Sequence, residues 1–115
     1  MEEITGKNYR VAYDSDNEVV AFEGTLRLRQ MVDYDSIEKL LKKAASEASS
    51  ILTLDLRGLE YLNSSGITTL SMFVYNLSQQ EDAKLAILAL QKYRWQARGL
   101  KDLKRLMPSL QLDIG

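Results

Sequence analysis

The sequence contains neither cysteine nor histidine, and each absence removes a class of chemistry. Without cysteine the chain cannot form a disulfide scaffold or a thiolate metal site, and this composition fits a reducing compartment. Without histidine it lacks the commonest general base and the commonest metal ligand, so neither a Ser-His-Asp triad nor a Cys-His pair can be built. We therefore expect no metal, no cofactor and no enzymatic activity.

Linkers, excess charge and long apolar runs are also missing. One proline and six scattered glycines among 115 residues leave no room for a linker, so residues 1–115 are expected to form a single domain. A net charge of -1 gives no reason to expect nucleic acid or an anionic membrane as a partner. The longest strongly apolar run, residues 85–90, is far shorter than the roughly 20 residues of a membrane span. Because the acidic Met1-Glu2-Glu3 start is followed by no apolar stretch, we expect no signal peptide and a cytoplasmic protein.

Three segments have helical periodicity. Apolar residues from Ile37 to Ala48 recur at intervals of three and four, with Asp33 or Asp35 as a plausible N-cap. The second segment has Ile67 and Leu77 at the ends of its apolar face, and Pro108 marks the end of the third. The predicted helices span residues 37–48, 64–80 and 97–107.

Other segments alternate as strands do. Residues 9–13 and 19–22 flank turn-forming residues and predict an opening hairpin. The run at residues 85–90 is apolar at every position, which is typical of a central strand covered on both faces. The predicted strands are residues 9–13, 19–22, 51–56, 85–90 and 110–114. The resulting order, β-β-α-β-α-β-α-β, predicts an α/β fold with a mixed sheet of four or five strands and three main helices.

One short motif stands at the start of the second predicted helix. Asn63, Ser64, Ser65 and Gly66 follow a strand-like segment, and the apolar helix face begins at Ile67. Asn and Ser are preferred helix N-caps because their side-chain oxygens accept hydrogen bonds from free backbone N–H groups. A phosphate on a serine at this point would also be stabilised, by about 0.3–1 kcal/mol at an exposed site, because it faces the positive end of the helix dipole. The motif is thus compatible with a cap, a phosphorylation site or both.

The segment Ile51–Leu56, together with Leu62–Ile67, resembles the phosphorylation-site region of STAS domains, among them the anti-sigma-factor antagonists. The family pattern is an apolar strand, then Asp-Ser-Ser/Thr-Gly at the start of a helix, and the order of elements and the Glu23–Leu26 segment are also similar. The resemblance implies a STAS-like fold and a phosphoacceptor at Ser64. It further implies exchange between protein partners: an anti-sigma-type serine kinase or another regulator, and a phosphatase.

Two residues depart from the family pattern. Asn63 stands in place of the family's aspartate, and Arg27 lies near the position where the antagonists have an acidic residue. The first change removes a negative charge beside the predicted phosphoacceptor, and the second reverses the charge at a position where an anti-sigma partner would expect an acid. They favour an alternative function, in which the chain is an assembly or scaffold component that binds a protein partner without phosphorylation.

A second group of residues is expected to border the motif. Lys92–Trp95 follows the predicted central strand, and loops after parallel strands emerge at the same edge of a sheet, where partners bind. We expect a partner-binding surface of Asn63, Ser64, Ser65, Gly66, Arg94 and Trp95, in which Arg94 could pair with a phosphate. Packing of Trp95 under the third helix is an equally good interpretation. Asp55 and Glu60 are interpreted as a strand residue and a surface residue, because no other group joins them to form an acid–base or metal site.

Overall fold

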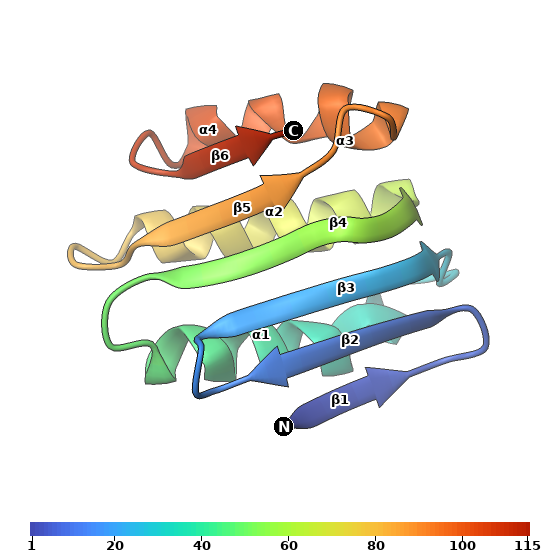
Figure 1. Cartoon of the computed structure of the whole chain (residues 1–115), viewed down its shortest axis with the longest axis horizontal. Coiled ribbons are helices and arrows are strands. Elements are labelled where there is room, and N and C mark those ends of the chain that lie inside the picture. Colours follow the sequence, from blue (N-terminus) through green and yellow to red (C-terminus); the bar gives the residue numbers. More distant parts are fainter.

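Three antiparallel strands form one half of a six-stranded mixed sheet. The computed structural model describes residues 1–115, and Figure 1 shows the sheet with its strands in sequence order. The carboxylate of Asp14 accepts hydrogen bonds from the backbone N–H of Asp16 (3.1 Å) and Asn17 (3.3 Å), and these bonds fix the expected turn. The antiparallel strands are β1 (Glu2–Thr5), β2 (Tyr9–Asp14) and β3 (Val19–Leu26).

The other half of the sheet is parallel, and helices connect its strands. β4 (Leu52–Leu62), β5 (Leu85–Ala89) and β6 (Gln111–Ile114) each run parallel to the strand before them. Every crossover moves in the same direction across the sheet, so right-handed connections place all helices on one face, behind the sheet in Figure 1. The helices are α1 (Asp35–Glu47), α2 (Ser64–Ser78), α3 (Arg94–Gly99) and α4 (Lys101–Leu106).

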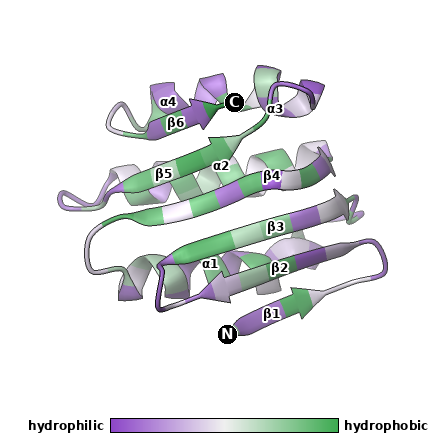
Figure 2. Ribbon diagram, in the orientation of Figure 1, coloured by the Kyte–Doolittle hydropathy of each residue, from purple (hydrophilic) through white to green (hydrophobic).

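This one-sided layer corrects the prediction that the 85–90 run is covered on both faces. Leu85, Ile87 and Ala89 are buried against the helices, whereas Ala86 and Leu88 are only half-buried on the open face. Figure 2 shows green, apolar residues on β3 to β5, in the middle of the sheet. An apolar strand is therefore compatible with a single covered face when the residues on the other face are small or lie next to neighbouring side chains.

The predicted number and order of elements were also partly wrong. The sheet has six strands. The short edge strand β1 was not predicted, because it has acidic residues where an apolar alternation would have revealed it. The predicted third helix is two helices, which meet at Gly99 and Leu100, and glycine costs about 1 kcal/mol inside a helix. Neither Asp33 nor Asp35 is the N-cap of α1. The N-cap of α1 is Tyr34, because a 3₁₀ turn, η1 (Met31–Tyr34), comes directly before the helix.

β4 continues far beyond the predicted end at residue 56. Its buried residues in this part are Leu56, Leu59 and Leu62, so two exposed residues lie between successive buried ones instead of one. The register against β3 shifts twice here, between Ala21 and Glu23 and between Gly24 and Thr25. Such bulges change the side-chain period and hide the strand from a search for alternation. The extended strand delivers the chain directly to Asn63 and the start of α2.

The core lies between the sheet and the helix layer. It includes the predicted apolar stripe of α1, with Ile37, Leu40, Leu41 and Ala44 all buried. No helix of the chain has both the length and the apolar composition that a membrane crossing requires.

Candidate functional site

Asn63 fixes the start of α2. It is the N-cap, with an extended backbone, and its side-chain Oδ1 accepts a hydrogen bond of 3.0 Å from the backbone N–H of Gly66. The same oxygen accepts a bond of 2.6 Å from the hydroxyl of Tyr34, which is 2% exposed. The side-chain Nδ2 of Asn63 donates to the carbonyl of Leu28 at 2.7 Å. One amide therefore joins α2 to η1 and to the segment that follows β3.

These contacts explain why asparagine stands where the STAS pattern has aspartate. An aspartate can accept the bonds from Gly66 and Tyr34, but it has no donor for the carbonyl of Leu28. Two oxygens would then face each other where a hydrogen bond of 2.7 Å now exists. The local structure selects the amide.

Ser64, the predicted phosphoacceptor, is the first residue of α2 and its side chain is exposed. It lies beside the free backbone N–H groups and the positive end of the helix dipole. Ser65 is half-buried, and its carbonyl accepts a bond of 2.9 Å from the hydroxyl of Thr69. Asn63–Gly66 is called the Ser64 loop below, and Ser64 is the most accessible of its residues.

Gly66 allows the close approach of η1 to α2. A Cβ atom here would lie 2.2 Å from Cδ1 of Leu62 and 2.8 Å from the hydroxyl oxygen of Tyr34. Both contacts are shorter than van der Waals packing allows, so a side chain would displace Tyr34 from Asn63. The glycine of the motif is required by packing at this point.

Arg27 lies beside the Ser64 loop. The carbonyl of Leu26 accepts a hydrogen bond of 3.1 Å from the backbone N–H of Asn63, so the end of β3 runs next to the loop. The guanidinium of Arg27 covers the ring of Tyr61, with 4.7 Å from Cζ to the ring centroid. The guanidinium at position 27 is thus packed on Tyr61 of β4, two residues before the Ser64 loop begins.

The predicted border residues lie in or next to α3. Trp95 is half-buried against the core, and its Nε1 donates to the carbonyl of Leu59 at 3.1 Å. Arg94 is exposed at the first position of α3. A Cβ atom built at Gly99 lies 4.0 Å from Cδ1 of Ile67, so α3 approaches the first turn of α2. Trp95 is thus partly packed on the core, and its role in binding a partner stays a prediction.

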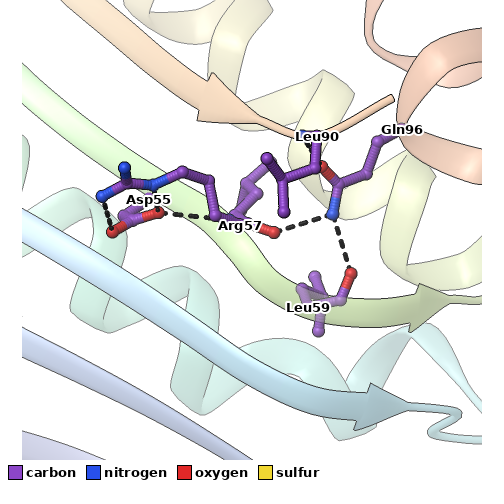
Figure 3. A network of polar contacts seen from close by, with 6 residues as sticks. Asp55, Arg57, Leu59, Leu90 and Gln96 are labelled. Carbon is purple, nitrogen blue, oxygen red and sulfur yellow. Dashed lines mark hydrogen bonds and ion pairs between the residues drawn. The ribbon is translucent and has the colours of Figure 1, made fainter. Parts of the chain in front are cut away.

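Gln96 is a structural residue that the sequence did not reveal. It is fully buried, and its Nε2 donates to the carbonyls of Leu56 (2.7 Å) and Leu59 (2.8 Å), as Figure 3 shows. Its Oε1 accepts a bond of 2.7 Å from the backbone N–H of Leu90. β5 pairs with β4 only as far as Asp55, so this side chain replaces the missing strand along the bulged part of β4. A glutamine among basic residues has no pattern that would identify this role.

Asp55 forms an ion pair on the open face of the sheet. Both of its oxygens accept from the guanidinium of Arg57, each at 3.0 Å (Figure 3). These hydrogen bonds hold the pKa of Asp55 below its ordinary value. Glu60 is exposed and forms no part of this pair. Asp55 is therefore occupied by a structural contact.

The sequence matches no family model and no curated protein sequence. Its fold, however, matches solved structures along the whole chain. A chain of the crystal structure of the diguanylate cyclase SiaD in complex with its activator SiaC, from Pseudomonas aeruginosa, matches with a TM-score of 0.76 and 13% identity, covering 100% of both chains. SiaC of Pseudomonas aeruginosa matches with a TM-score of 0.73 and 16% identity over 100% of this chain and 98% of that one.

An anti-sigma factor antagonist from Mycobacterium paratuberculosis also matches. Its TM-score is 0.66 at 19% identity, and the match covers 90% of this chain and 85% of that one. These identities are low enough that the likeness concerns the fold alone. The STAS-like fold that the motif implied is confirmed.

Proposed function

We propose that this chain is a cytoplasmic regulator that binds a protein partner through the Ser64 loop and is switched by phosphorylation of Ser64. The observation that carries the proposal is the exposure of Ser64 at the first position of α2, beside an N-cap that holds the loop in place. A kinase can reach this hydroxyl. A partner that contacts the loop would meet any phosphate attached to it.

The chemistry of the loop supports a switch. Phosphate adds about -1.5 to -2 charges at neutral pH. The positive end of α2, at which Ser64 is the first residue, would stabilise these charges. A switch changes affinity only when the two states make different contacts with the partner, and a group at the loop surface meets that condition.

The solved structures support partner binding of this kind. SiaC occurs in a complex with a diguanylate cyclase that it activates, and another structure of this fold is an anti-sigma factor antagonist. We infer that the present chain likewise acts by binding, with an anti-sigma-type serine kinase or another regulator as its partner and a phosphatase that restores the unmodified form. Catalysis is not part of the proposal, because histidine and cysteine are absent and Asp55 is held by Arg57.

Asn63 supports a second candidate, a scaffold component that binds its partner without phosphorylation. A kinase that selects the family's aspartate would not find it here, because this position is asparagine. The amide of Asn63 is in addition bound to Leu28 and Tyr34.

Phosphate-affinity electrophoresis separates the two candidates. The wild-type chain, Ser64→Ala and a control, Ser46→Ala, which is exposed on α1, would be recovered from the source cells. A switched module shows a retarded band in the wild type and in Ser46→Ala that is absent from Ser64→Ala. If no retarded band occurs while a partner still co-purifies with the chain, the scaffold function is correct.

A further inference from the structure

Exposed apolar side chains gather on the helical face of the molecule. Seven large apolar residues are exposed, and two of them, Met1 at the chain start and Tyr61 beneath Arg27, lie elsewhere. The other five lie on η1, α2 and α4: Met31, Val32, Met72, Tyr75 and Leu106. α2 packs against both η1 and α4, so these five share one region.

α2 has an uncharged outer surface. None of its 15 residues is charged, which is unusual for an exposed helix. Ser64, Thr68, Met72 and Tyr75 are exposed at intervals of four, four and three, and therefore form one row, called the α2 ridge below. Met72 is 49% and Tyr75 51% exposed. A charged group placed against this row would lose its water without gaining a counter-charge, so the complementary surface is apolar.

A basic surface lies along one side of the ridge. Residues 92–105 carry six basic side chains and one acidic one, although the whole chain has a net charge of -1. All six basic side chains are exposed, and we call them the basic flank: Lys92, Arg94, Arg98, Lys101, Lys104 and Arg105. They belong to α3, α4 and the turn before them; α4 packs against α2 and is largely purple in Figure 2.

The other side of the ridge is electrically balanced. On α1, Lys42 pairs with Glu38 at 2.8 Å and Lys43 pairs with Glu2. The only ion pair of the basic flank joins Arg105 to Asp102 at 3.9 Å, and both side chains are largely exposed. The charge beside the ridge is therefore positive on one side only.

We propose that the α2 ridge and the basic flank bind an amphipathic helix of the partner protein, with its apolar stripe on Met72 and Tyr75 and its acidic side along the basic flank. This inference rests on the proposed function, because the ridge begins at Ser64. From Ser64 to Tyr75 the ridge is about 16 Å long, or three turns of a docked helix. Nucleic acid fits less well, since its phosphates would find no cation along the ridge. A phosphate on Ser64 would lie at the end of this site and repel the acidic side of the helix.

Site-specific photo-crosslinking in the source cells tests the proposal and captures the partner in the same experiment. A benzophenone amino acid is placed at position 72 or 75 of the ridge, at position 92 in the Lys92–Trp95 segment that is predicted to border the Ser64 loop, or at control positions 39 on α1 and 111 on β6. We expect one protein to be crosslinked from positions 72, 75 and 92 and not from 39 or 111. The crosslinked peptide of that protein should have an acidic, amphipathic helical sequence.

Charge reversal supplies the second arm of the test. The pair Lys101→Glu and Arg105→Glu should lower the crosslinking yield from position 72 at least fivefold. The matched pair Lys7→Glu and Lys39→Glu, which changes the net charge equally, should leave it unchanged. Crosslinking from position 92 alone would overturn the ridge site but not the proposed function. The absence of a protein adduct at every position would overturn both. Equal yields in the two charge-reversed chains, a basic peptide, or adducts to nucleic acid or lipid would also overturn the proposed helix.

Discussion

Asn63 shows how a single side chain can hold a loop in place and at the same time depart from the STAS motif. Its amide uses an acceptor for Gly66 and Tyr34 and a donor for Leu28, so each of its polar atoms has a structural partner. The motif Asn63–Gly66 was recognisable from the sequence because helix capping is a local property. Tyr34 and Leu28 were not predicted as its partners, since they approach it only when η1 folds against α2.

Replacement of Asn63 by aspartate is expected to destabilise the fold. The substitution leaves the carbonyl of Leu28 without its donor and places a carboxylate against it, which costs about 1–3 kcal/mol. Urea unfolding measures this loss. Asn76→Asp is the matched control, because Asn76 is exposed on the same helix and its change should stay within about 1 kcal/mol. Equal stabilities for the two variants would show that the bond to Leu28 does not hold the loop.

Because of Tyr13, the stability of the protein is expected to change with pH in the alkaline range. Burial, together with a hydrogen bond of 2.7 Å to Glu47, raises the pKa of Tyr13 from 10.0 to about 12. Between these two values the unfolded chain loses the phenolic proton while the folded chain keeps it. Stability is therefore retained below pH 10 and falls as the pH rises towards 12. Thermal melting across this range should show a smaller decline for Tyr13→Phe than for the wild type, and an identical decline would contradict the assignment.

β4 and α3 form a unit that neither segment could form alone. The bulged end of β4 has backbone carbonyls without a strand partner, and Gln96 of α3 provides the missing donors. The alternation of residues 52–56 made the first part of the strand predictable. The second part follows a different period, and its stabilising contact comes from a residue 37 positions away from Leu59. Such a contact has no local signature in the sequence.

Gln96→Ala is expected to be among the most destabilising exchanges of a polar residue in this chain. It leaves the carbonyl of Leu56 and the N–H of Leu90 without the bonds from this side chain, while the carbonyl of Leu59 keeps the bond from Trp95; each buried group left unpaired costs about 1–3 kcal/mol. Urea denaturation with Gln91→Ala, an exposed control, measures the difference. A loss below about 1 kcal/mol would mean that water replaces the side chain without cost.

The molecule as a whole has two unlike faces, an open sheet and a layer of helices. The general fold was predictable because helices and strands alternate in the sequence and right-handed crossovers restrict their arrangement. The number of strands was not predictable, since a short edge strand leaves only a weak pattern. The position of all helices on one face of the sheet was not predictable either, since apolar residues in β5 do not reveal what covers them. The expected partner surface of the Ser64 loop, Arg94 and Trp95 remains a prediction, although α3 does approach the first turn of α2.

The central claim is that the charge state of Ser64 controls partner binding, and calorimetry with a chain that carries phosphoserine tests it most directly. The partner that co-purifies with the unmodified chain is titrated with three proteins: the unmodified chain, the chain with phosphoserine at position 64, and a control with phosphoserine at exposed position 46 of α1. We predict that phosphate at position 64 weakens binding at least tenfold, about 1.4 kcal/mol, while phosphate at position 46 leaves the affinity unchanged. Equal affinities for all three proteins would contradict the switch and leave Ser64 as part of a helix cap.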